Sequence, residues 1–128
     1  MRLLLDTHVV LWWFQGNPRM TMAARAAIDS EGSAVFVSPI SAFEIAFKHR
    51  MGKLPEASAL AGNFELMTAE QNFQQLPLTS SHAITAGDLT ISHRDPFDRL
   101  LIAQALVEDL TLISNERLFD TAGVTRLW

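Results

Sequence analysis

Short apolar runs of strand character alternate with helix-forming sequence along the chain, and this alternation constrains the fold most. Each run is too short for a helix and ends at polar or turn-forming residues. Strands that alternate with helices are typical of an α/β domain around a mainly parallel sheet. The predicted strands cover residues 3–5, 34–37, 73–76, 111–114 and 124–128, and the predicted helices or helical turns cover 8–14, 20–30, 39–48, 58–69, 79–89, 97–109 and 116–120.

We expect one domain over residues 1–128, because no repeat, low-complexity tract or linker divides the chain. With 48% hydrophobic residues the chain can bury a substantial core, which excludes disorder. No apolar run approaches the roughly 20 residues that span a membrane. The N-terminal apolar run meets Asp6, which is incompatible with the core of a signal peptide. A cytoplasmic domain without a membrane contact is therefore expected.

Composition and missing motifs exclude several chemistries. The chain has no cysteine, so disulfides, thiolate zinc sites and cysteine nucleophiles are excluded. A net charge of −4 argues against a broad basic surface that holds nucleic acid, but permits a few phosphate contacts. There is no nucleophile elbow, P-loop, dinucleotide fingerprint or H-E-x-x-H motif, and the four His residues are scattered. A metal–carboxylate site or no catalysis remains.

Four acidic residues lie where such a site would form. Asp6 follows the first predicted strand, Glu44 lies on the helix after the second, Asp98 begins a helix and Glu116 follows the fourth strand run. Ligands of parallel sheets bind outside the carboxyl ends of the strands. Two carboxylates 4 Å apart repel by about 4 kcal/mol at an effective dielectric constant of ~20, so a cluster needs a cation or protons. Oxygen ligands without cysteine favour Mg²⁺ or Mn²⁺ over zinc.

Each acid also has a purely structural interpretation. Asp6 could cap the following turn, and Asp98 could complement the dipole of a helix that Asp95 caps. Glu116 could be an ordinary surface acid. Glu44 fits a capping box that starts three residues earlier, although the Ser-Pro pair upstream is the better helix start and leaves Glu44 in the helix interior.

Basic residues near the acids predict a phosphate track. Lys48 and Arg50 lie on or just after the helix of Glu44, while Arg94 and Arg99 flank the acids at the start of the later helix. All four are candidate phosphate contacts. The alternative is that they are helix-end cations on a solvated face, with Arg99 paired to Asp95 at helical spacing.

Three consecutive aromatic residues, at positions 12–14, form an unusual triplet. Core packing is the simple interpretation. Because three consecutive helical residues cannot share one face, we expect at least one to be exposed, where it could contact a partner.

Four segments stand out along the chain, in the order LLLDTHVVLWW, SPISAFEIAFKHRMGKL, HRDPFDRLLIAQAL and TLISNERLF. In these segments and their order the chain resembles PIN-domain proteins, and more narrowly the VapC-type toxins of bacterial toxin–antitoxin systems. The combination of LLLDTH with DPFDRLLIAQA is specific, whereas either piece alone would be weaker. The resemblance spans Leu3 to Trp128.

This resemblance implies an α/β/α sandwich around a parallel sheet and an endoribonuclease that depends on Mg²⁺ or Mn²⁺. It places three acids, Asp6, Glu44 and Asp98, as metal ligands and catalytic residues. The family's fourth acid is usually an Asp after the late strand, and Glu116 occupies that place here. The residues expected to orient the carboxylates or water are Thr7, Asp95, Ser114 and Asn115.

The resemblance also implies partners: an RNA substrate, a cognate antitoxin and a second copy of the chain in a homodimer. Two alternatives stay open. The chain could be a catalytically weak PIN-like module that binds nucleic acid or a partner, or a metal-dependent phosphatase or DNA nuclease that uses the same acids.

Overall fold

Five parallel strands form one sheet in the computed structural model, which describes residues 1–128. The strand order is β3-β2-β1-β4-β5, and every neighbouring pair is parallel. The predicted α/β class is therefore confirmed, and the sheet is parallel throughout. The two edge strands are shorter than predicted. The strands are β1 (Arg2–Leu5), β2 (Ala34–Val37), β3 (Gln74–Gln75), β4 (Thr111–Ile113) and β5 (Arg126–Leu127).

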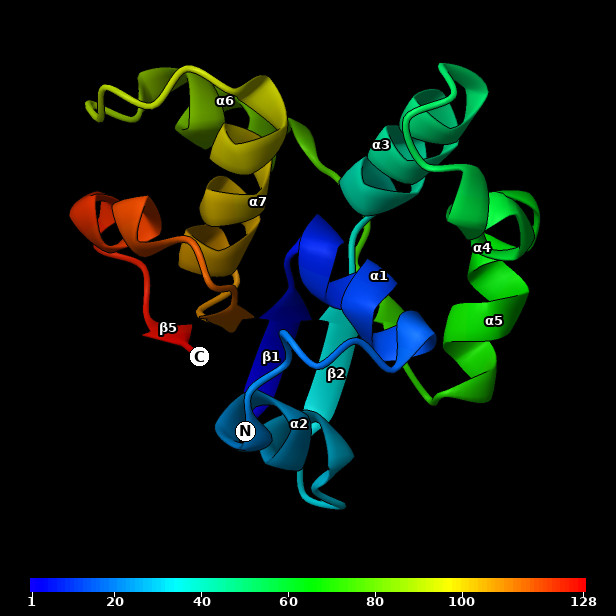
Figure 1. The fold of residues 1–128 in the computed structure, drawn as a ribbon. Helices are drawn as coiled ribbons and strands as arrows, with labels where there is room; N and C mark the ends of the chain where they lie inside the picture. The colour runs from blue at the N-terminus through cyan, green and yellow to red at the C-terminus, as the bar shows by residue number, and fades with distance from the viewer.

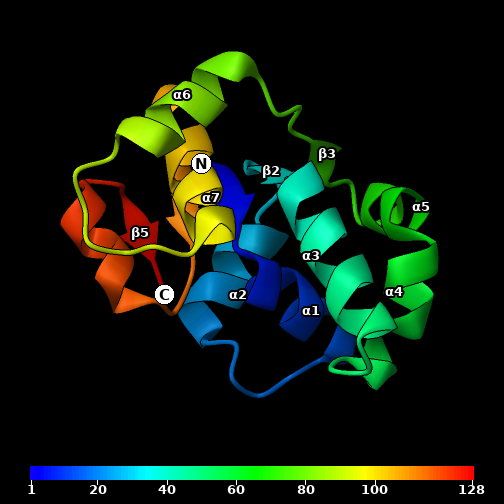
Figure 2. The ribbon, with the colours of Figure 1, turned by 90° about the horizontal axis from the view of Figure 1, so that it is seen from above.

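Helices make the connections between the strands and cover both faces of the sheet (Figures 1 and 2). The predicted helix over 58–69 is in fact two short helices that meet at Asn63. The final helical turn is a 3₁₀ turn rather than an α-helix. In chain order the connecting elements are α1 (Thr7–Gln15), α2 (Met22–Asp29), α3 (Pro39–Arg50), η1 (Pro55–Ala57), α4 (Ser58–Gly62), α5 (Phe64–Glu70), α6 (Ser80–Asp88), α7 (Pro96–Val107) and η2 (Arg117–Ala122).

Two hydrophobic cores lie on opposite faces of the sheet, because successive strand side chains point in opposite directions. Leu3 and Leu5 belong to the core shared with α1, α2, α3, α4 and α5. Leu4, between them, belongs to the core shared with α7. The result is a three-layer α/β/α sandwich, as the sequence predicts.

The aromatic triplet lies inside this structure. Trp12 is buried, while Trp13 and Phe14 are half-buried and pack on Phe73. The expectation that one of the three is exposed is therefore wrong, because Phe73, which precedes β3, packs against both partly buried rings at the edge of the core.

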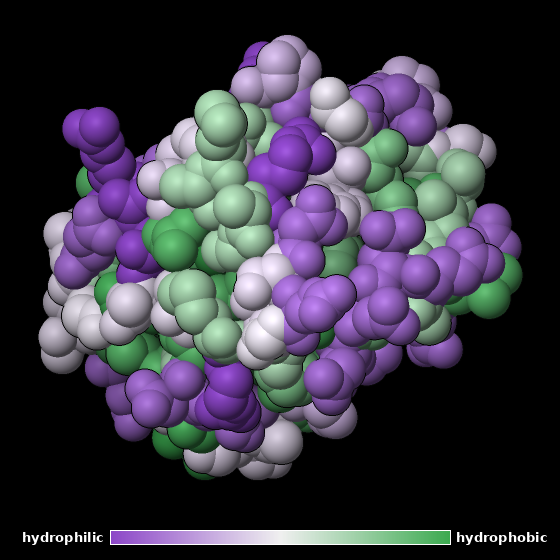
Figure 3. Space-filling view, turned by 90° about the horizontal axis from the view of Figure 1, so that it is seen from below, coloured by the Kyte–Doolittle hydropathy of each residue, from purple (hydrophilic) through white to green (hydrophobic).

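Hydrophobic and hydrophilic residues are interspersed over the face seen from below in Figure 3, on the side where the strands begin. None of the helices combines the length and the apolar character that crossing a membrane requires.

Candidate active site

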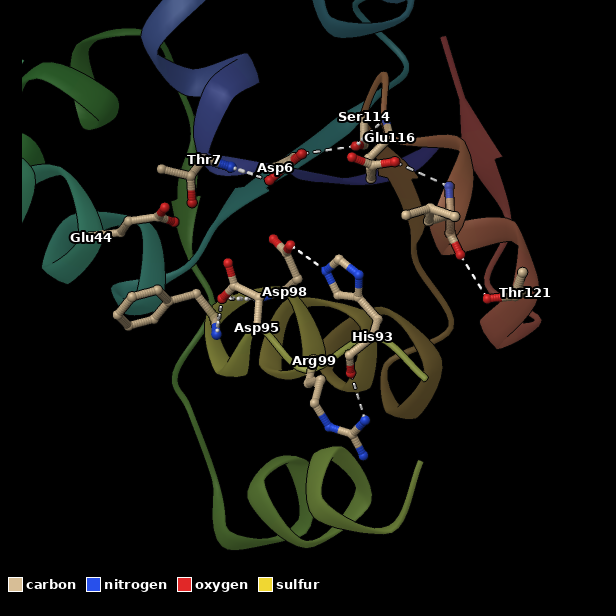
Figure 4. A network of polar contacts seen from close by, with 12 residues as sticks. Asp6, Thr7, Glu44, His93, Asp95, Asp98, Arg99, Ser114, Glu116 and Thr121 are labelled. Atoms are coloured by element: carbon tan, nitrogen blue, oxygen red, sulfur yellow. Dashed lines mark hydrogen bonds and ion pairs between the residues drawn. The ribbon is translucent and has the colours of Figure 1, made fainter. Parts of the chain in front are cut away.

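The carboxyl ends of β1 and β4 lie side by side in the middle of the sheet, where the strand order changes direction. In open parallel sheets this switch point is where ligands bind. Asp6 follows β1 directly, and Ser114 and Glu116 follow β4. Glu44 on α3 and Asp98 on α7 point toward the same space from either side (Figure 4). The structure therefore places the four acids that the sequence predicts around one space at the same end of the sheet.

Asp6 is the most deeply buried of these acids, with 3% of its surface exposed. It caps α1, and its Oδ1 accepts a hydrogen bond from the backbone N–H of Thr7 at 2.7 Å. Its Oδ2 accepts one from the hydroxyl of Ser114 at 2.8 Å. Burial, with a smaller contribution from the nearby charge of Asp98, raises the pKa of Asp6 to about 6. The helix-cap interpretation of Asp6 is thus correct, and it does not account for the burial.

Glu44 lies in the interior of α3, because the helix begins at Pro39 with Ser38 as its N-cap. The capping-box alternative for Glu44 is therefore wrong. The Glu44 side chain is buried, and its Oε2 accepts a hydrogen bond from the ammonium group of Lys48 at 2.5 Å. The ammonium group of Lys48 therefore compensates the negative charge of Glu44.

Asp98 lies in the first turn of α7, which Asp95 caps by accepting hydrogen bonds from the backbone N–H groups of Phe97 and Asp98. The Asp98 Oδ2 lies 2.6 Å from Nε2 of His93. Burial raises the pKa of Asp98, partly offset by the hydrogen bond with His93, and the neighbouring charges of Asp95 and Glu44 raise it further. The sequence does not single out His93, and its only signal is its position just before the acidic helix start.

Ser114 connects two of the acids. Its hydroxyl donates to Asp6 and accepts a hydrogen bond from the backbone N–H of Glu116 at 3.0 Å. The Glu116 side chain caps η2 through the backbone N–H of Leu118, at 3.2 Å. The side chain of Asn115 is exposed and has no hydrogen-bond partner. Glu116 is thus held beside Asp6 by the turn that follows β4.

Thr7 lies behind the carboxylates. Its hydroxyl and that of Ser41 on α3 are 2.9 Å apart, and both residues are buried. This contact fixes the start of α1 against the helix that carries Glu44.

The four predicted phosphate contacts differ in their surroundings. Arg50 and Arg94 are exposed, and Lys48 is half-buried against Glu44. Arg99 is committed elsewhere: its Nε and both terminal nitrogens donate to backbone carbonyl groups, and it forms no ion pair with Asp95. The acceptors are the carbonyl oxygens of Ala86, Gly87, Leu89, Ile91 and His93.

These five bonds use every N–H group of the guanidinium. We therefore leave Arg99 out of the proposed phosphate contacts. It secures the segment that leads to His93 and α7.

The donor set fits a hard divalent cation, because it consists of carboxylate and hydroxyl oxygens around a buried acid whose pKa is raised. No group of three or more His, Asp or Glu side chains is already drawn together closely enough to hold a metal ion. Lys48 and His93 instead occupy oxygens of Glu44 and Asp98. The second oxygens, Oε1 of Glu44 and Oδ1 of Asp98, have no hydrogen-bond partner, so both carboxylates can still offer an oxygen to a cation.

A parallel α/β/α sandwich with carboxylates around its switch point defines the class of this protein: an α/β fold with an acidic centre. Residues 3–124 match the family model of the PIN domain. The chain belongs to the PIN-domain family.

Within that family the chain is similar to VapC proteins. It is 31% identical over 115 residues to Ribonuclease VapC22 of Mycobacterium tuberculosis (strain ATCC 25618 / H37Rv), with 89% of this chain and 86% of the relative covered.

Solved structures share the fold. VapBC2 from Rickettsia felis, solved with a DNA fragment from its promoter, matches with a TM-score of 0.74 at 14% identity, covering 99% of this chain and 98% of that one. VapBC-1 from nontypeable Haemophilus influenzae matches with a TM-score of 0.69 at 17% identity, covering 99% and 97%. These likenesses confirm the predicted α/β/α fold.

Proposed function

We propose that this protein is an endoribonuclease that depends on Mg²⁺ or Mn²⁺ and acts as the toxin of a toxin–antitoxin pair. The observation that carries the proposal is the buried carboxyl group of Asp6, whose pKa is raised to about 6 and which faces further acids at the switch point. Such an arrangement is unfavourable for folding alone and becomes favourable when a cation binds. The similarity to Ribonuclease VapC22 supports RNA as the substrate.

The proposed ligands of the cation are Asp6, Glu44 and Asp98, with Glu116 as the fourth acid. When bound, Mg²⁺ or Mn²⁺ supplies positive charge that lowers the pKa of a water molecule toward neutrality and stabilises the charge of the transition state. Ser114 and Thr7 hold Asp6 and α1 in place, so the carboxylate needs little reorganisation to bind a cation.

Lys48 has two proposed roles. Its ammonium group neutralises the carboxylate of Glu44. Where a bound cation compensated that carboxylate, the ammonium group would be free to contact a phosphate, with the exposed Arg50 and Arg94 completing the track. Asp95 keeps the first turn of α7, and with it Asp98, in place.

The proposed reaction is the attack of water on a phosphodiester. The P–O3′ bond breaks, and the products carry a 5′-phosphate and a 3′-hydroxyl. Because water and not the RNA 2′-hydroxyl is the nucleophile, the site needs no group that deprotonates the 2′-hydroxyl.

We also propose that the protein forms a homodimer, binds a cognate antitoxin and works in the cytoplasm. The solved structures that share this fold are of VapBC proteins, and this similarity supports an antitoxin as the partner.

A binding module without catalysis is the second candidate. The observation that favours it is that Lys48 and His93 each bind an oxygen of Glu44 and Asp98, so both carboxylates already have partners within the chain. In a binding module these contacts would be permanent.

The test is cleavage of total cellular RNA by the purified protein with Mg²⁺ or Mn²⁺, compared with EDTA. Asp6→Asn, purified identically, controls for contaminating nucleases and should retain the fold. We expect cleavage that requires both the metal and Asp6, with 5′-phosphate ends. Equal cleavage by Asp6→Asn would overturn the proposal. No cleavage by folded, antitoxin-free protein would favour the binding module, and preferred cleavage of DNA or of a small phosphate ester would reassign the substrate.

A further inference from the structure

Two phenylalanines on α3 and the methionine that caps its C-terminus form an exposed row. Phe43, Phe47 and Met51 expose 56%, 50% and 54% of their surfaces. Helical residues four apart share one face, so these side chains line one stripe. Phe64, Phe73 and Phe119, by contrast, are buried. An isolated exposed apolar residue is ordinary, but two neighbouring exposed phenyl rings are not.

The rings contact one another and extend onto α7. The ring centroids of Phe43 and Phe47 lie 5.8 Å apart with an interplanar angle of 20°, which is a stacked arrangement. Phe43 also lies 5.6 Å from the half-buried ring of Phe97, at 46°. We call Phe43, Phe47 and Phe97 the aromatic platform.

The aromatic platform borders the acidic site through the backbone. Phe43 immediately precedes Glu44 and Phe97 immediately precedes Asp98, so each helix contributes one acid and one ring next to it. Figure 4 shows Glu44 on α3 and Asp98 on α7 on different sides of Asp6, and Figure 2 shows these two helices flanking the end of β1. Lys48 and the exposed Arg50 follow on the same helix. Rings, acids and cations are thus adjacent.

We infer that the aromatic platform stacks an unpaired base next to the phosphodiester that the acids cleave. This inference rests on the proposed ribonuclease function and deepens it by naming the side chains that hold a base beside the cut. Proteins that bind single strands combine a basic track with exposed aromatic rings, because every base has a π-face that stacks on them. Bases inside a duplex are already stacked and cannot use the platform.

An apolar face of a second copy of the chain is the competing occupant. It would suit the regular row on α3, but an apolar face offers no partner to the exposed Arg50, which follows the rings on the same helix. It also offers none to the partly exposed carboxylate of Asp98, the residue after Phe97. A nucleotide carries a phosphate, and its negative charge attracts the divalent cation that the acids bind.

The test measures binding separately from cleavage. Asp6→Asn protein, which should not cut, is titrated in Mg²⁺ with a short labelled RNA that has no internal pairing, and the affinity is read by fluorescence anisotropy. Phe43→Leu and Phe47→Leu keep the apolar bulk and remove the π-face, and Phe43→Trp keeps the π-face. Leu66→Ala, at an exposed position on α5, is the control.

We expect each leucine variant to weaken binding about tenfold, which is about 1.4 kcal/mol, while Phe43→Trp and Leu66→Ala bind like the parent. The loss should vanish when the RNA is replaced by an abasic oligonucleotide of the same length. Unchanged affinity in both leucine variants would overturn the inference. So would an equal loss on abasic RNA, or a change of Phe43→Leu protein from dimer to monomer in light scattering without a loss of affinity.

The RNA-cleavage assay on the protein that retains Asp6 tests the nuclease proposal independently of the aromatic platform. A protein that cuts RNA but binds it independently of Phe43 and Phe47 would disprove only the aromatic platform. A protein that cuts nothing but loses affinity in the leucine variants would disprove only the catalysis.

Discussion

The hydroxyl group of Ser114 donates a hydrogen bond to Oδ2 of Asp6 at 2.8 Å, although 108 residues separate the two positions. The contact exists because β4 pairs with β1 in the middle of the sheet, with Ile113 opposite Leu5. It lowers the pKa of Asp6 and so opposes the effect of burial. Ser114 therefore keeps the most buried acid closer to its charged form.

Replacing Ser114 with alanine should weaken metal binding. Without the donor the pKa of Asp6 should rise further above 6, so a larger share of the carboxyl is protonated at pH 7. We expect the affinity for Mn²⁺ to fall about tenfold, as for other groups that orient a ligand. Titration followed by electron paramagnetic resonance measures this, with Ser92→Ala at an exposed position as the control. Equal Mn²⁺ affinities of the wild type and Ser114→Ala would show that the Ser114 hydroxyl does not prepare Asp6 for metal binding.

Asp6→Asn should stabilise the metal-free protein at neutral pH. In the unfolded chain Asp6 loses its proton near its ordinary pKa of 3.8, whereas in the folded chain it keeps the proton to about 6. Stability is therefore lost as pH rises between these values and stays lost above them, by about 3 kcal/mol in total.

Urea unfolding in EDTA at pH 4 and pH 7 measures this difference between the wild type and Asp6→Asn. Asp120→Asn is a control of opposite sign, because Arg126 lowers the pKa of that exposed acid. Addition of Mg²⁺ should stabilise only the protein that retains Asp6. A wild type that is no less stable at pH 7 than at pH 4, relative to Asp6→Asn, would contradict the burial argument.

Two substitutions at Glu116 should separate its two roles. Glu116→Gln keeps an acceptor for the backbone N–H of Leu118 but removes the charge, whereas Glu116→Ala removes both. We expect the glutamine variant to be as stable as the wild type and to cleave RNA at least tenfold more slowly, and the alanine variant also to lose about 1 kcal/mol of stability with the cap. Wild-type cleavage by Glu116→Gln would assign Glu116 to the cap alone.

Lys48→Met should change metal and RNA binding in opposite directions. Removal of the ammonium group frees the carboxylate of Glu44, so Mn²⁺ should bind more tightly. The loss of one phosphate contact should raise KM for RNA and reduce the dependence of binding on salt. Lys53→Met, at an exposed position after α3, is the matched control. A KM that stays the same in both variants would remove Lys48 from the phosphate track.

Arg99→Lys should destabilise the protein, because an ammonium group cannot reach the five carbonyl oxygens that the guanidinium binds. We expect a loss of about 2–3 kcal/mol and faster amide hydrogen exchange in residues 86–93. Arg94→Lys, in the same segment and exposed, should leave both unchanged. If Arg99→Lys protein exchanged at the wild-type rate, the segment would be held by other contacts.

Local patterns were sufficient to predict most of the fold and the positions of the acids. Ser38 before a proline and Asp95 before another mark helix starts through contacts within a few residues, and the structure has both caps. The convergence of the acids follows from one rule about parallel sheets.

The contacts of His93 and Arg99 could not be predicted in this way. They depend on the path of an irregular segment between α6 and α7, which has no periodicity to read. Arg99 lies at the spacing that suggests an ion pair with Asp95, yet its guanidinium reaches the carbonyl groups of that segment instead. Such choices are made by tertiary contacts, which sequence spacing does not encode.

The position of β4 next to the central strand β1 has a consequence for the newly made chain. Because β4 is synthesised only after α7, one edge of β1 has no pairing strand during most of translation. A chain that stops before residue 111 carries Asp6, Glu44 and Asp98 but lacks Ser114 and the strand that joins the two halves. Truncated translation products would therefore be inert, and their unpaired strand edge would make them prone to aggregation.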